Sequence, residues 1–177
     1  MKFIIAIFLL VSFIFPRSVS ANKISGLSGI LLNSYKVNNF SEDPRILKME
    51  TFLVYYNSPL VRHSRLLVEA SDNYDLPWTL VVSIAGVESG FCKKIKKESY
   101  NCWGWKNGNH NFESIEDAIF TVTRTLRSKY YNRGINTPEL IAPIYAPPSL
   151  LWSRKVRYFM NLIENTQITD YSLQFTL

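Results

Sequence analysis

Glu88 is the residue of this sequence whose setting most favours acid–base chemistry. It lies near the end of the most apolar helical stretch of the chain, which runs from Pro77 to Ser89. A carboxylate in such surroundings loses hydration, and this loss raises its pKa unless a cation pairs with it. A carboxyl group that keeps its proton near neutral pH can serve as a general acid. The competing interpretation is that the helix turns Glu88 outward into water, as happens to most charged residues.

The chain has two cysteines, Cys92 and Cys102, and both follow shortly after Glu88. Their number and spacing favour one disulfide closing a small loop in an oxidising compartment. In the chain-entropy model, closing a loop of that size contributes about 3 kcal/mol to stability. With only His63 and His110 as further ligands, the sequence predicts no metal site, and a bridged cysteine cannot act as a nucleophile.

The N-terminal segment predicts export of the chain. Lys2 is followed by an apolar run from Phe3 to Phe15 and then by small residues up to Ala21. This pattern is typical of a secretory signal peptide, here residues 1–21, and the run is shorter than the roughly 20 residues of a membrane span. The alternative is an uncleaved N-terminal anchor, which would be the only membrane contact. Either way we expect a secreted or extracytoplasmic protein, in the cell wall or periplasm.

The composition excludes several classes of protein and suggests a class of partner. With 47% hydrophobic and 19% charged residues, the 177-residue chain is neither disordered nor a polytopic membrane protein. Its formal charge of +6 falls to +4 if residues 1–21 are removed, leaving 18 basic against 14 acidic residues. A mildly basic exported protein suits anionic surfaces such as cell-wall polymers. Four lysines lie close together at positions 93, 94, 96 and 97, where a solvated loop is the simpler interpretation, and nucleic-acid binding is not expected.

Helix signals organise the rest of the chain into one mainly helical domain. Residues 22–45 are rich in Ser, Asn and Gly and are interpreted as a poorly ordered leader, whereas residues 46–168 form the domain. An apolar stretch of unassigned type, suited to a short helix, occupies residues 46–57. Later helices are predicted to start at Ser58-Pro59, at Pro77, at Ser114, at Thr137-Pro138 and at Ser149.

Residues 91–113 interrupt this helical pattern directly after the buried helix. They show no helical period and contain both cysteines and the cluster Trp103-Gly104-Trp105. Gly90, just before them, suits the left-handed turn that ends many helices. The predicted fold class is therefore mainly α, with a small irregular or β-hairpin lobe inserted after the buried helix. Such a lobe is a plausible second wall for a cleft at Glu88.

Two segments resemble known families. The run from Ile84 to Phe91 resembles the catalytic glutamate segment of the lysozyme-like superfamily, in which goose-type lysozymes and soluble lytic transglycosylases carry a similar Glu-Ser-x-Phe. The run from Asn101 to Lys106 is similar to the Asn-x-x-Gly-x-Lys element of bacterial endo-β-N-acetylglucosaminidases. A later run, from Phe112 to Trp152, also matches the spacing of those glucosaminidases. The resemblance therefore covers about residues 58 to 165 and implies an α+β lysozyme-like fold for the glycosidase domain at 46–168.

The resemblance implies cleavage of β-1,4-linked amino-sugar chains, above all peptidoglycan. Acid-assisted cleavage of this kind needs no cofactor, and we expect a monomer. Glu88 would protonate the leaving oxygen, and Glu98 is the candidate second carboxylate if it faces Glu88 across the cleft. Related enzymes also manage with one glutamate, using the N-acetyl group or the 6-hydroxyl of the substrate. A lytic transglycosylase, a muramidase and a non-catalytic glycan-binding module remain the alternatives.

The resemblance also suggests substrate contacts. Tyr145 would position the sugar near the acid, or would be a core tyrosine with a satisfied hydroxyl. Ser89 would bind in the cleft or cap the helix end, and Asn101 would bind an N-acetyl group or the backbone of the lobe. Trp103 and Trp105 are candidates for stacking on sugar faces, and we expect one of them to line the cleft.

Overall fold

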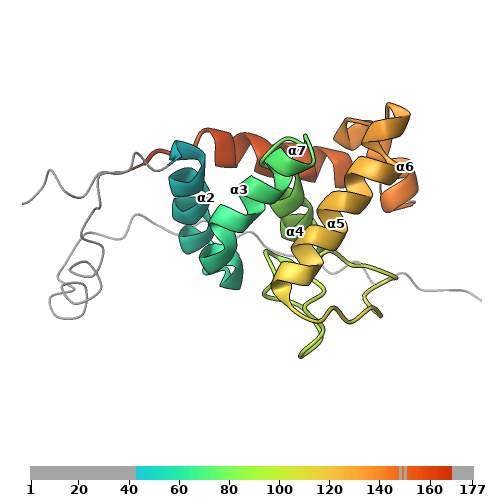
Figure 1. Cartoon of the computed structure of the whole chain (residues 1–177), viewed down its shortest axis with the longest axis horizontal. Helices are drawn as coiled ribbons and strands as arrows, with labels where there is room; N and C mark the ends of the chain where they lie inside the picture. Colours follow the sequence, from blue (N-terminus) through green and yellow to red (C-terminus); the bar gives the residue numbers. More distant parts are fainter. Residues whose placement is uncertain (1–42, 148, 150, 169–177) are drawn as a thin grey trace, which may run out of the picture. The chain divides into compact units, whose positions relative to one another are not determined.

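The computed structural model describes residues 43–147, 149 and 151–168 (Figure 1). The expected signal peptide at 1–21 and the greater part of the expected leader lie outside the described residues. The helical elements, in chain order, are α2 (Pro44–Tyr55), the 3-10 helix η1 (Pro59–His63), α3 (Ser64–Asn73), α4 (Leu80–Ser89), α5 (Ile115–Lys129), the 3-10 helix η2 (Tyr131–Arg133), α6 (Pro138–Tyr145) and α7 (Trp152–Glu164). This part of the chain is mainly helical, as the sequence predicts.

Helix α4 forms the centre of the domain. It is buried on nearly every side and contacts α3, α5 and α7. The close packing depends on Gly86, where an added Cβ would lie 2.5 Å from the ring of Phe91. Because α4 is fixed from several directions, the residues at its C-terminal end have little freedom to move.

Short side-chain caps define several of the helix starts. Ser58 Oγ accepts a hydrogen bond from Leu60 N, Ser114 Oγ from Asp117 N and Thr137 Oγ1 from Leu140 N. Each cap satisfies a backbone donor that the first helical turn leaves unpaired. The helix starts predicted at residues 58, 114 and 137 are thus confirmed, although residues 59–63 form a 3-10 helix before α3.

Three predicted boundaries differ from the structure. Helix α7 begins at Trp152 after Leu151, so Ser149 is not its cap. Helix α4 begins at Leu80, after a turn at residues 77–79, rather than at Pro77. Helix α2 begins at Pro44, capped by Asp43, and thus includes the last two residues of the expected leader. In α2, Arg45 binds both Asp43 and Asp72, which ties the start of the helix to α3.

The lobe after α4 is irregular. Residues 91–113 form turns and bends without a strand in the described structure, so the β-hairpin version of the prediction is wrong and the irregular version is right. Cys92 and Cys102 form the predicted disulfide within it. Several lobe residues, among them Phe91, Cys92 and Glu98, adopt positive φ angles. This backbone cannot follow the extended path that strand pairing requires.

Candidate functional site

The Glu88 carboxyl group lies at the C-terminal end of α4, between α7 and the lobe. Trp152 Nε1, at the start of α7, donates a hydrogen bond of 2.7 Å to Glu88 Oε1. The other oxygen faces the lobe at Gly104, where an added Cβ would lie 2.5 Å from Glu88 Oε2. Gly104 also has a φ of +66°, so both its backbone conformation and its close approach to the carboxyl group require glycine.

Glu88 is half-buried rather than turned out into water. Burial raises the pKa of Glu88 above its ordinary value, and the hydrogen bond from Trp152 opposes this effect only in part. The direction agrees with the physical expectation, because burial disfavours the charged form of a carboxyl group. The side chain therefore has the environment that a general acid needs.

A hollow of about 460 Å³ opens beside Glu88. The wall contains the start of α7 and the segment that connects α6 to α7. Its lining residues are Val87, Glu88, Ala146, Pro147, Ser149, Trp152 and Lys155. Glu88 is the only acidic residue in this lining, so it is the only carboxyl group that could donate a proton to a ligand in this hollow.

A second hollow, of about 310 Å³, is lined by parts of the lobe, α5 and α6. Gly104 and Tyr145 belong to its lining, and each connects it to the Glu88 site. Gly104 lies against the Glu88 carboxyl group, and the ring of Tyr145 lies 5.1 Å from that of Trp152, which binds Glu88. Residues that line the second hollow thus contact residues that line the first, although the two linings have no residue in common.

Tyr145 lies near Glu88, but its hydroxyl group is engaged within the protein. It donates a hydrogen bond of 2.7 Å to Trp103 O and so ties α6 to the lobe. Burial raises the pKa of Tyr145 well above its usual range, and the charge of nearby Glu88 raises it further. Tyr145 is therefore neutral and connects α6 to the lobe beside Glu88. It also belongs to the lining of the second hollow.

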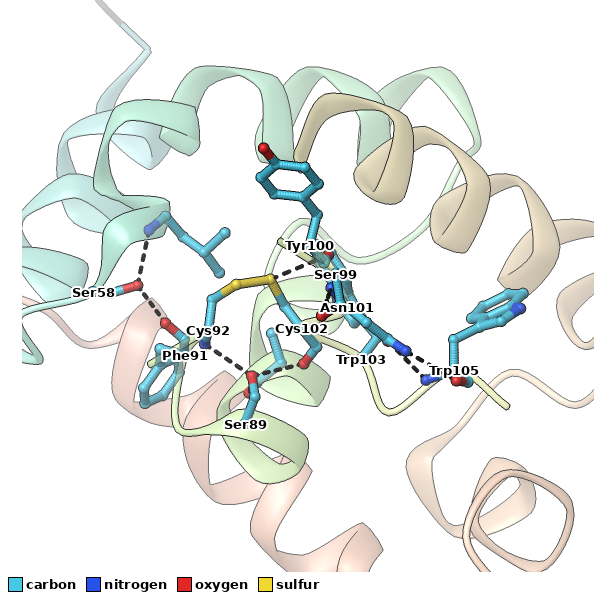
Figure 2. Close-up of a disulfide and its surroundings, with 12 residues drawn as sticks. Ser58, Ser89, Phe91, Cys92, Ser99, Tyr100, Asn101, Cys102, Trp103 and Trp105 are labelled. Carbon is cyan, nitrogen blue, oxygen red and sulfur yellow. Dashed lines mark hydrogen bonds between the residues drawn. A yellow bond between two sulfur atoms is a disulfide. The ribbon is translucent and has the colours of Figure 1, made fainter. Parts of the chain in front are cut away.

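Ser89 connects α4 to the lobe instead of facing the cleft (Figure 2). Its hydroxyl group lies 3.0 Å from Ala85 O and 2.8 Å from Cys102 O, and it accepts a hydrogen bond from Cys92 N. The side chain is buried. Its position therefore favours the structural interpretation over substrate binding.

Asn101 is likewise committed to the backbone of the lobe. Its amide group donates hydrogen bonds to Trp105 O and His110 O and accepts one from Trp105 N. Figure 2 shows the side chain pointing toward Trp105. With these bonds made, the asparagine is not free to hold an N-acetyl group and instead shapes the turn over Glu88.

The two tryptophans of the lobe have different roles. Trp103 is fully buried and donates a hydrogen bond of 2.9 Å from Nε1 to Val81 O in α4. Trp105 is half-buried, packs edge-on against Phe112 and lines the second hollow. Trp103 also belongs to that lining, but its side chain is fully buried, so Trp105 is the one placed to meet a ligand.

Glu98 does not join Glu88. Its side chain is 80% exposed and pairs with Lys97 at 3.9 Å. Glu98 lines neither of the two hollows, whose only acidic lining residue is Glu88. The position thus disfavours Glu98 as the second carboxylate, because its exposed position and its lysine neighbour keep it on the outer surface of the lobe.

Two residues that shape the site were not singled out as functional from the sequence. The sequence predicted no contact between Trp152 and Glu88, although a tryptophan carries an N–H donor as well as an apolar ring. Gly104 looked like part of an aromatic cluster. A glycine between two tryptophans was the available signal for a close approach of the backbone.

Neither a metal centre nor a membrane span is found where the chain is described. Across residues 43–147, 149 and 151–168, no group of three or more His, Cys, Asp or Glu side chains could hold a metal ion. The helices of this same part are all too short or too polar to cross a bilayer.

No known protein family model matches the chain, and no curated protein matches its sequence.

Proposed function

We propose that this protein is an exported glycosidase that cleaves β-1,4-linked amino-sugar chains of peptidoglycan, with Glu88 as the general acid. One observation carries the proposal. A half-buried glutamate with a raised pKa lies at the end of a buried helix, held by Trp152 and bordering an open hollow. This combination of burial, orientation and access is what protonation of a glycosidic oxygen requires.

The two oxygens of Glu88 have different surroundings. Oε1 accepts the indole N–H of Trp152, so the proton of the acid form belongs on Oε2, beside Gly104. Transfer of that proton to the glycosidic oxygen breaks the bond to the leaving sugar and leaves positive charge on the other ring. Glu88 becomes a carboxylate, and a water molecule or hydroxyl group that attacks the ring returns a proton to it.

The developing positive charge must be met without a second carboxylate from the lining of either hollow. We infer that the substrate supplies this group. Its N-acetyl oxygen would assist hydrolysis, as in some endo-β-N-acetylglucosaminidases. A lytic transglycosylase would use the 6-hydroxyl group of the sugar to close an anhydro ring, whereas a muramidase would add water after muramic acid.

The proposed fold is lysozyme-like. A helical domain with a glutamate at the end of its central helix and an irregular lobe opposite that residue supports this assignment. Export through residues 1–21 agrees with a disulfide in the lobe, because such bonds persist in oxidising compartments. The basic charge of the chain suits an anionic wall polymer, and we infer that it acts as a monomer.

A zymogram with peptidoglycan in the gel tests the proposed activity. We expect clearing by the wild type and none by Glu88→Gln, which preserves size and the oxygen that accepts from Trp152. Glu98→Gln is the matched control and should clear the gel like the wild type, since Glu98 is on the outer surface. Clearing by Glu88→Gln would contradict the assignment of the acid.

Mass spectrometry of the digested wall identifies the bond. Fragments ending in reducing N-acetylglucosamine indicate glucosaminidase activity, and those ending in reducing muramic acid indicate a muramidase. A 1,6-anhydromuramic end would exclude simple hydrolysis and indicate a transglycosylase.

A glycan-binding module is the second candidate, and the isolation of Glu88 from other acidic lining residues favours it. In that case neither the wild type nor Glu88→Gln clears the gel, yet both sediment with insoluble peptidoglycan. The gel and the sedimentation assay therefore separate the two candidates.

A further inference from the structure

The second hollow presents three different walls to a ligand. The lobe contributes Trp105 and Lys106, the C-terminal end of α5 contributes Lys129 and Tyr130, and α6 contributes Tyr145. Its volume of about 310 Å³ lies at the lower end of the range for small-molecule sites, which begins near 300 Å³. The hollow is thus sized for one sugar ring with a substituent.

Two lysines give this hollow a positive charge. Lys106 comes from the lobe and Lys129 from the end of α5, and no acidic residue belongs to its lining. Both lysines are exposed, and neither forms an ion pair within the described part of the chain. Two uncompensated ammonium groups around one concave surface attract an anion.

The Glu88 hollow has a charge of the same sign at its margin. Lys155 belongs to its lining, and Arg154 and Lys155 both line a further depression on α7. Gly104 and Tyr145, which line the second hollow, contact Glu88 and Trp152 of the first, so a chain bound across Glu88 would meet basic side chains on both hollows. The only acidic group in this lining is the carboxyl group that we propose as the proton donor.

We propose that the second hollow is a subsite for an amino sugar that carries a carboxylate. The sugar ring would lie against Trp105, and Lys106 and Lys129 would bind the carboxylate. This inference rests on the proposed function and narrows it, because it makes acidic glycans, and not neutral chitin-like chains, the preferred substrate. Peptidoglycan offers such carboxylates in two forms: on the stem peptide where it is present, and on the lactyl group of muramic acid where the peptide has been removed.

Binding measurements with the Glu88→Gln protein test this subsite without depending on cleavage. Titration calorimetry would compare three ligands: neutral chitin oligosaccharides, peptide-free glycan strands with lactyl carboxylates, and strands that retain their stem peptides. We expect at least one acidic ligand to bind about tenfold more tightly than the neutral one, which corresponds to about 1.4 kcal/mol. Added salt should reduce this preference, because the lysines are exposed.

The double substitution Lys106→Gln/Lys129→Gln in the same protein should remove the preference and leave chitin affinity unchanged within about twofold, a difference below 1 kcal/mol. Lys94→Gln/Lys96→Gln is the matched control, since it removes the same charge from exposed positions of the lobe outside both hollows. Thermal unfolding of each variant verifies that it is folded.

The ligands also distinguish the source of the carboxylate. A preference already present with peptide-free strands assigns the lactyl group, and one that needs the peptide assigns the stem. Equal binding of neutral and acidic ligands, an equal loss in the control pair, or no binding at all would overturn the subsite. The zymogram reports separately on cleavage, so a failed subsite and a failed enzyme assignment give different results.

Discussion

Three local conditions set Glu88 apart from a glutamate on an exposed surface. It is half-buried, one oxygen is fixed by Trp152, and the other faces the backbone of Gly104. Burial raises its pKa, which preserves the acid form, whereas the indole hydrogen bond favours the carboxylate. The two effects therefore act on the pKa of Glu88 in opposite directions, and burial is the larger.

The raised pKa of Glu88 predicts how the stability of the protein changes with pH. Below the ordinary value of 4.5, Glu88 is protonated in both the folded and the unfolded states and contributes no pH dependence. As the pH rises from there through the raised pKa, the folded protein retains a proton that the unfolded chain has lost, so the free energy of unfolding falls. We therefore expect Glu88→Gln to be more stable than the wild type at neutral pH, with the gain vanishing below about pH 4.

Urea unfolding at a series of pH values measures this difference. Glu98→Gln provides the control, because an exposed carboxyl group beside Lys97 should show no such gain at neutral pH. A Glu88→Gln protein that gains nothing between acid and neutral pH would mean that Glu88 is not desolvated.

Gly104 and Gly108 form a natural pair for testing the contact with the carboxyl group. Both have positive φ angles, +66° and +80°, so alanine at either position should cost about 1–2 kcal/mol of stability. Only at Gly104 would the new Cβ meet Glu88, since nothing lies within 4 Å of the corresponding atom at Gly108. We expect Gly104→Ala to reduce zymogram clearing strongly, and Gly108→Ala to leave it near that of the wild type.

The same two variants can also be compared by a measurement that does not depend on activity. The NMR signal of the Trp152 indole N–H should follow the ionisation of Glu88, because the two groups share a hydrogen bond. Gly104→Ala should shift that titration and Gly108→Ala should not. Identical titrations in both variants would show that the lobe does not constrain the carboxyl group.

At the scale of elements, the disulfide closes the lobe on itself, and Ser89 connects the lobe to α4. The Ser89 hydroxyl contacts Cys92 N and Cys102 O, which lie on the two sides of the bridge. Ser89→Ala would leave these buried backbone groups unpaired, so we expect a loss of about 1–3 kcal/mol. Ser71→Ala is the matched control, because this buried serine bonds only to Leu67 O in its own helix and should cost less than about 1 kcal/mol.

Hydrogen exchange shows where each substitution acts. Ser89→Ala should speed the exchange of amides in residues 91–113, whereas Ser71→Ala should leave the lobe protected. If both variants unfold at the same urea concentration and protect the lobe equally, Ser89 does not connect it to α4.

The helices were predictable because their signals are local. Polar caps at Ser58, Ser114 and Thr137 and the left-handed Gly90 act within one turn of the chain. Ser149 had the right residue type for a cap, but the chain turns back through Ser149 N and Ala146 O before α7 begins. A cap signal thus identifies a helix more reliably than it identifies the first residue.

The candidate site was predictable at Glu88 and much less so around it. The apolar residues of α4 follow one another in the sequence, and they predict that a side chain at the end of this helix loses hydration. The partners Trp152 and Gly104 come from segments 64 and 16 positions away in the chain, and only tertiary packing decides which of their atoms reach the carboxyl group. For the same reason Asn101 and Ser89, which sit next to the site in the sequence, turn out to bind the backbone.

At the scale of the whole molecule, exposed positive charge and a basic composition point to an anionic polymer as partner. Lys106, Lys129 and Lys155 line the hollows around one acid, and the chain as a whole has a formal charge of +6. Long-range attraction of this kind increases the rate of encounter with an anionic partner, and it weakens as salt is added.

Export can be tested on the intact chain together with its disulfide. We expect the protein outside the cytoplasm to begin at Asn22, with the formal charge lowered from +6 to +4 by loss of Lys2 and Arg17. We also expect Cys92 and Cys102 to resist alkylation until a reductant is added, because they form one bridge. Intact mass spectrometry of the secreted and membrane fractions, with and without reduction, measures both properties. A full-length chain confined to the membrane fraction would replace the cleaved signal peptide with an anchor, and free thiols in cytoplasmic protein would contradict export altogether.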